Sequence, residues 1–123
     1  MNKIQVIHAF WSGFGIKAYN ENSVPTGLKY PYITYDMSWT DDFGEEVAQT
    51  ASIWYKTESK SWTDVAAKAQ EISAAIGGGG TVYHCDDGTI WIKKANPWAQ
   101  LMGDAEDDSI RRIVLNVAIT FFV

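Results

Sequence analysis

The chain has few of the residues that hold stapled or metal-dependent folds together. Its 123 residues include one cysteine, Cys85, and two histidines. A single thiol cannot form an internal disulfide, and two histidines leave few ways to build a zinc site or a histidine-activated nucleophile. We therefore expect a domain that is stabilised by its own core, uses no metal or other cofactor and is not an enzyme.

Positive charge and long apolar runs are also scarce. Ten Lys and Arg accompany fifteen Asp and Glu, so the formal net charge is -5. This balance argues against nonspecific nucleic-acid binding, which needs clustered basic residues to neutralise phosphates. No apolar run approaches the length of a membrane span, and the first residues lack the basic-then-apolar pattern of a secretory signal. The sequence thus predicts a soluble cytosolic protein with no membrane partner.

Aromatic residues are plentiful, and the C-terminal end alternates apolar with more polar residues. Six Trp and six Tyr exceed average usage. Every odd position from Ile113 to Phe121 is apolar, which predicts a strand with one buried face over Ser109 to Val123. Because such a strand would reach on the order of 40 Å, more than is usual, we expect part of it to leave its own domain. Its edge would then pair with a partner subunit.

The order of the predicted elements indicates the fold class. Helices and strands alternate along residues 1–123 without a linker or repeat, which predicts a single α+β domain. Its sheet should be mostly antiparallel, with two helices packed on one face. The expected helices cover 4–14 and 61–76, the second with a Ser61/Asp64 capping box and an Asp64–Lys68 pair on its solvent side. The expected strands cover 16–19, 32–39, 46–56, 81–84, 89–93 and 109–123, with 32–39 and 46–56 paired as a β-hairpin.

Candidate catalytic groups are weak. His84, Cys85, Asp86 and Asp87 form the densest set of potential metal ligands, but neighbouring strand residues point to opposite faces and cannot all converge on one ion. The four glycines from Gly77 follow a helix and lack a Lys-Ser or Lys-Thr pair, so they indicate a connector and not a phosphate loop. Loop carboxylates are numerous enough that acid-base chemistry by a pair stays open.

The segment Asn96 to Asp108 is the best candidate for a functional site. It is predicted to be an irregular, proline-led loop that carries four acids and precedes two arginines. Acids and arginines could pair between neighbouring copies, or the arginines could tie down the loop of their own chain. A closed ring needs two different complementary patches, and the candidates are the turn at 40–45 and the C-terminal strand. The candidate interface residues are Asp41, Asp42, Phe43, Trp98, Gln100, Asp104, Glu106, Asp107, Asp108, Arg111 and Arg112.

Short motifs spread over nearly the whole chain carry a family resemblance. These motifs are Phe14–Gly15, Ala18–Tyr19, Val24–Pro25, Tyr30–Tyr35, Ser52–Tyr55, Lys68, Ile72, Asp87–Gly88, Trp91, Pro97–Gln100, Asp107, Asp108 and Ile110–Arg112. In them the chain resembles small proteins of tailed-bacteriophage morphogenesis modules, namely tail terminator or head-to-tail joining proteins, which are often labelled minor capsid or tail completion proteins.

The resemblance implies a structural role in the virion. Such a subunit would form a ring of six copies that caps the tail tube and joins it to the DNA-filled head. Its partners would be copies of itself, the tail tube protein and a head-completion or connector protein, and DNA would only pass through its channel. We expect it at the junction of tail and head, after assembly in the host cytoplasm.

Two other functions stay open from the residues alone. Exposed Trp39, Trp91 and Trp98 could form a platform that stacks on a carbohydrate, although tryptophan is also a preferred anchor of protein interfaces. A small hydrolase would instead use a pair of loop carboxylates, at least one with a strongly perturbed pKa in a concave pocket.

Overall fold

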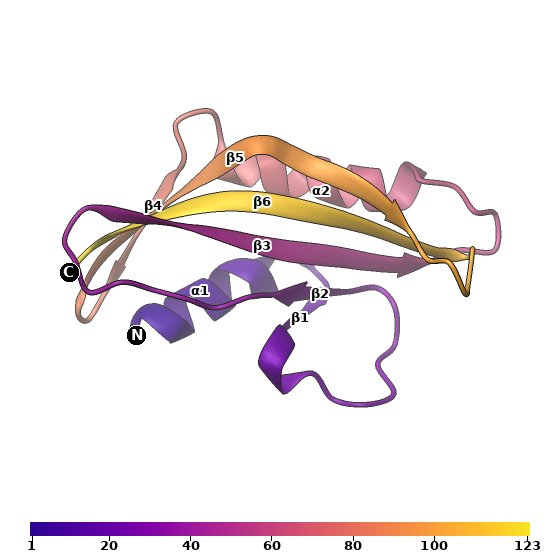
Figure 1. Ribbon diagram of the computed structural model, residues 1–123, viewed down its shortest axis with the longest axis horizontal. Helices are drawn as coiled ribbons and strands as arrows, with labels where there is room; N and C mark the ends of the chain where they lie inside the picture. The colour runs from indigo at the N-terminus through magenta and orange to yellow at the C-terminus, as the bar shows by residue number, and fades with distance from the viewer.

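The computed structural model describes all residues, 1–123, and contains one six-stranded sheet and two α-helices (Figure 1). The strand order is β1-β2-β3-β6-β5-β4, and every neighbouring pair is antiparallel except β1 with β2. The predicted α+β class is confirmed. The elements are α1 (Lys3–Trp11), β1 (Lys17–Asn20), β2 (Tyr32–Tyr35), β3 (Glu45–Lys56), α2 (Thr63–Ile76), β4 (Thr81–Cys85), β5 (Gly88–Gly103) and β6 (Ile110–Phe122).

Strand β6 has the predicted alternation but not the predicted position. Its odd residues from Ile113 to Phe121 are all buried, as expected. However, β6 lies in the middle of the sheet, between β3 and β5, and both neighbours pair with it along nearly its whole length (Figure 1). The expectation that this strand leaves the domain and offers an edge is therefore wrong. Its length is matched by two long neighbours within the same chain.

Strand β5 is much longer than predicted. The sequence suggests a strand at 89–93 followed by a loop from Asn96, but β5 continues to Gly103. A β-bulge lies between Lys94 and Ala99, where β5 shifts register against β6 and accommodates Pro97. A proline is tolerated there because the bulge and the sheet edge require no ladder hydrogen bond from its nitrogen. Only the turn at 104–108 remains of the expected loop.

Both helices pack on the same face of the sheet. Val6, Ile7, Phe10 and Trp11 of α1 join one continuous core with buried residues of α2 and the odd positions of β6. Figure 1 shows α2 running behind the long strands. The helix positions are close to those predicted, although Ile4 is exposed and Val6 takes its place in the core. The opposite face of the sheet has no helix over it.

Two local predictions about α2 and its surroundings are wrong. The N-cap position is Trp62 without a side-chain hydrogen bond, and Ser61 Oγ instead accepts from the amide of Thr63, so no capping box forms. Lys68 does not pair with Asp64. Its ammonium group lies 3.0 Å from a carboxylate oxygen of Glu71 and donates to the Phe14 carbonyl at 2.7 Å, which ties α2 to the end of the first helical segment.

The predicted pairing of residues 32–39 with 46–56 is confirmed in part. β2 and β3 are antiparallel, with Tyr35 opposite Ala51, but residues 36–44 form a long connector and not a continuation of the strand. The buried side chain of Gln49 on β3 donates to the Ser38 carbonyl. This hydrogen bond holds the connector against the sheet.

Candidate functional site

The acidic turn, residues 104–108, joins β5 to β6 at the end of the sheet opposite the two chain termini (Figure 1). Its aspartates fix its own backbone. Asp104 Oδ1 accepts from the amides of Glu106 (2.8 Å) and Asp107 (3.2 Å), and Asp107 Oδ1 accepts from the amide of Ser109 (3.0 Å) and from its hydroxyl. Such aspartate-to-backbone bonds stabilise turns. The shape of the turn is thus set locally.

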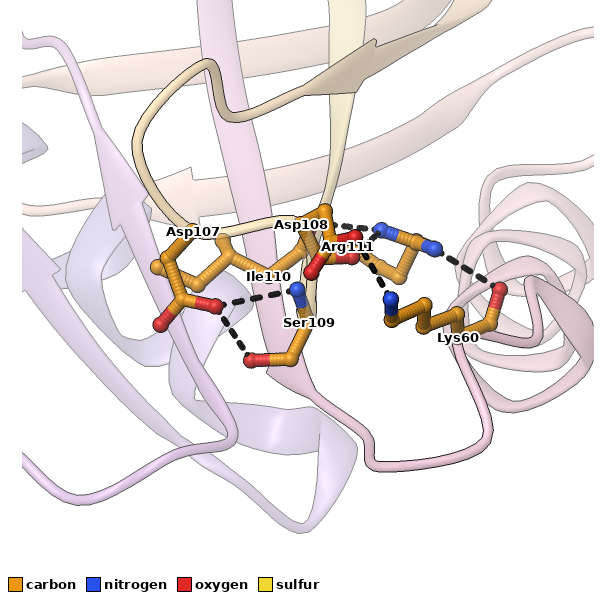
Figure 2. A network of polar contacts seen from close by, with 6 residues as sticks. All are labelled: Lys60, Asp107, Asp108, Ser109, Ile110 and Arg111. Atoms are coloured by element: carbon orange, nitrogen blue, oxygen red, sulfur yellow. Dashed lines mark hydrogen bonds and ion pairs between the residues drawn. The ribbon is translucent and has the colours of Figure 1, made fainter.

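Arg111 anchors the turn from inside. It is 9% exposed, and its Nε and Nη2 donate to the carbonyl of Lys60 at 3.0 and 2.8 Å. Its Nη1 donates to the carbonyls of Ile110 and Asp108, as Figure 2 shows. Because these bonds occupy the guanidinium within its own chain, Arg111 is not free to pair with the acids of a neighbouring copy. The sequence left open whether the arginines pair with a neighbouring copy or tie down the loop of their own chain. The contacts of Arg111 match the second alternative.

Arg112 points to the opposite face, the one without helices. Its Nε donates to Ser52 Oγ (3.1 Å) and its guanidinium lies 4.6 Å above the centroid of the Trp54 ring. Trp54 in turn stacks on Tyr32, with ring centroids 6.0 Å apart and an interplanar angle of 17°. A cation on an aromatic face is a favourable contact. Arg112 is therefore part of a cation-aromatic ladder that crosses the sheet.

The four acids of the turn differ in how their charge is compensated. Lys56 lies 3.2 Å from Asp107, and Lys60 lies 2.6 Å from Asp108. The hydrogen bonds from Ser109, followed by the contact with Lys56, lower the pKa of Asp107 from 3.8 to about 2. Asp104 and Glu106 have no cationic partner in the chain. The turn therefore carries two uncompensated negative charges.

The distal segment of β5, residues 95–103, is an open sheet edge. Its inner side pairs with β6, but β4 pairs only with Gly88–Ile92, so the outer side of residues 95–103 has no strand beside it. Trp98 packs against the core, and Gln100 accepts from Asn116 at 3.1 Å. Leu101 and Met102 are 60% and 44% exposed. Apolar side chains thus lie beside unpaired backbone groups.

The predicted patch at 40–45 lies far from the acidic turn and beside the end of the C-terminal strand of its own chain. Residues 40–45 lead into β3, which begins at Glu45, at the end of the sheet where β6 finishes, since Glu45 pairs with Phe121. There Asp41 lies 3.4 Å from the ammonium group of Lys3, and Phe43, 73% exposed, contacts Phe122. Asp42 has no ion-pair partner. The structure therefore does not bring this patch together with the acidic turn in one subunit.

The groups required by the two alternative functions are not assembled into one site. Trp39 lies beside α1, Trp91 donates to the Gly79 carbonyl on the open face, and Trp98 packs on the core, so the three rings do not share a platform. No carboxylate is fully buried. Partial burial raises the pKa of Asp36, but its oxygens accept hydrogen bonds from Thr50. No group of three His, Cys, Asp or Glu side chains could hold a metal ion.

A groove at the β1 edge of the sheet has no counterpart among the sites expected from the sequence. It has a volume of about 460 Å³ and lies between residues 15–19 and 27–31. Lys17 and Lys29 line it, together with Tyr19 and Tyr30. Both lysines are exposed. They lie 12 residues apart and belong to no motif, and the parallel pairing of β1 with β2 brings their segments together.

Comparison with known proteins adds no relationship to these observations. No protein-family model matches the chain, and no curated protein is significantly similar to it. None of its helices has the length and apolar character needed to cross a membrane.

Proposed function

We propose that this chain is a noncatalytic structural subunit of a tailed-bacteriophage particle, which caps the tail tube and joins it to the head as a ring of six copies. Its partners are copies of itself, the tail tube protein and a head-completion or connector protein. The assignment to a tail terminator rests on the sequence resemblance. Its place is the junction between tail and head, which it reaches after assembly in the host cytoplasm.

One observation carries the structural part of the proposal: the open outer edge of β5 at residues 95–103. An unpaired strand edge is a template for pairing with another chain, and natural monomers usually protect it with charges, prolines or bulges. The first half of this segment has such protection, because the bulge and Pro97 lie there. The second half, residues 99–103, carries exposed Leu101 and Met102 instead. This favours a paired edge in the assembled state.

Charge also supports a role in a channel. The net charge is -5, and only two cationic side chains, Lys17 and Lys29, lack a partner within the chain, which is too few to neutralise a run of phosphates. A ring of such subunits would present DNA with a repulsive surface on which it could slide without binding. Neither the carbohydrate-binding nor the hydrolase alternative has an observation in its favour.

The direct test removes the chain from the particle. In a phage genome that encodes this protein, deletion of its gene should leave DNA-filled heads and separate tails of uncontrolled length, visible by electron microscopy. Expression of the chain from a plasmid should restore joined particles. Particles of normal tail length and normal joining after the deletion would contradict the proposed function.

A further inference from the structure

The β1 groove contains the two lysines that have no polar partner in the molecule. Every other Lys and Arg side chain makes an ion pair or hydrogen bond within the chain. Lys17 and Lys29 make none, and both line the same groove. In an acidic protein, two free cations gathered in one concave site indicate an anionic occupant.

The acidic turn has the complementary property. Asp104 and Glu106 lack a cation, whereas Lys56 and Lys60 compensate the other two acids. The turn also follows directly on the open edge of β5, so a partner that pairs with this edge would meet the turn as well. The free anions of the turn and the free cations of the groove thus lie on two surfaces, each next to an edge of the sheet.

The sheet register places these two surfaces at the same level on opposite edges. One row of paired residues crosses the sheet from the β1 edge to the β5 edge: Lys17, Tyr32, Trp54, Arg112 and Met102. The groove lies at one end of this row, and the acidic turn begins two residues after the other end. A copy displaced sideways by one sheet width would therefore bring its turn to the groove of its neighbour.

The strand directions allow the same contact to extend the sheet. β1 is parallel to β2, and three antiparallel steps then lead to β5, so β1 and β5 run in opposite directions. Copies related by a rotation about an axis along the strands keep these directions. The distal segment of β5 would then meet β1 of the next copy as an antiparallel pair. Two different surfaces in contact make a heterologous interface, which can close into a ring.

We propose that the β1 groove binds the acidic turn of a second copy of this chain, with Lys17 and Lys29 facing Asp104 and Glu106. This deepens the proposed function and rests on its self-assembly. DNA phosphate is the competing occupant of a basic groove, but two lysines in a strongly acidic protein give phosphates little to bind. An acidic segment that is already fixed by its own hydrogen bonds loses less entropy on docking.

Two charge variants test the contact without disturbing the fold. Lys17→Glu with Lys29→Glu reverses the groove, and Ala105→Lys with Glu106→Lys reverses the uncompensated charge of the turn while Asp104 keeps its backbone bonds. Each variant alone should self-associate on the order of a hundredfold more weakly than the wild type, by native mass spectrometry and sedimentation. An equal mixture should assemble again, because each reversed groove meets a reversed turn in alternating copies.

The controls distinguish failure of the proposed contact between groove and turn from failure of ring assembly. Gln70→Lys with Ala74→Lys adds positive charge on the exposed side of α2 and should assemble like the wild type. If the wild type and both reversed variants all form rings, the groove assignment is wrong and the proposed function stands. A wild type that stays monomeric at millimolar concentration overturns both. Unchanged assembly with loss of duplex-DNA binding in the groove variant would identify phosphate as the occupant and overturn the proposal.

Discussion

The two halves of β5 have the same backbone conformation but opposite surroundings. Gly88–Ile92 lies between β4 and β6 and contributes buried Ile90 and Ile92 to the core. Residues 95–103 pair on one side only and expose Leu101 and Met102. One strand is thus paired on both sides at one end and on one side only at the other. The two ends therefore have different roles although both belong to the same sheet. The first half stabilises the subunit, and the second half is available to a neighbour.

The largest contrast between the halves should come from their glycines. Gly88 has φ +143, and a Cβ there would lie 2.3 Å from the carbonyl oxygen of Phe122. Gly88→Ala should therefore lower the free energy of unfolding by on the order of 4 kcal/mol. Gly103→Ala is the matched control, because a Cβ added there would meet no atom within 4 Å and its φ is ordinary. Equal losses in urea denaturation would contradict the distinction.

Apolar truncation should separate stability from assembly. Ile92 is 1% exposed, so Ile92→Ala removes core contacts and should cost about 3 kcal/mol in urea denaturation. Leu101→Ala should change monomer stability by no more than about 0.5 kcal/mol. Sedimentation should nevertheless show weaker self-association for Leu101→Ala. A large loss of monomer stability there would mean that Leu101 belongs to the core.

The two arginines after the turn should also respond differently. Arg111→Ala leaves the carbonyls of Lys60 and Asp108 without their donor, and we expect a loss of about 2 kcal/mol in thermal or urea unfolding. Arg112→Ala, on the open face, should cost less. This corrects the expectation that both arginines are free to serve an interface. A folded, fully stable Arg111→Glu variant would contradict the anchoring role.

The smallest expected effect is the pH dependence of the turn. The pKa of Asp107 is lowered from 3.8 to about 2, so its ionised form stabilises the fold above the unfolded pKa, and this contribution is lost as the pH falls through the folded value. Asp107→Asn should have a lower melting temperature than the wild type at neutral pH. The difference should close between 3.8 and about 2. A difference that persists below that range would point to a cause other than ionisation.

The sequence predicts the positions of helices and strands better than it predicts which strands pair with one another. The alternation of apolar and polar residues from Ile113 to Phe121 correctly predicts that β6 has one buried face. It does not indicate whether the strand lies at the edge or in the centre of the sheet. The continuation of β5 was missed because Asn96 and Pro97 are typical of loops, whereas the bulge accommodates them within the strand. Both errors concern pairing with distant segments.

The sequence predicts which residues belong to the candidate site, but it does not predict which contacts each of them makes. Asp107 and Arg111 do belong to an organised turn, but the partner of Arg111 is the carbonyl of Lys60, 51 residues away in sequence. No local pattern reports such a contact. Lys17 and Lys29 belong to no sequence motif, and only the fold reveals that they share a groove.

Hydrogen exchange of β5 tests the central claim most directly. Deuterium uptake should be followed by mass spectrometry in peptides that cover 88–94 and 95–103, at concentrations below and above self-association. We expect residues 88–94 to be protected in both states and residues 99–103 to become protected only in the assembled state. Assembly without any added protection at residues 99–103 would contradict the pairing of this edge with a neighbouring copy.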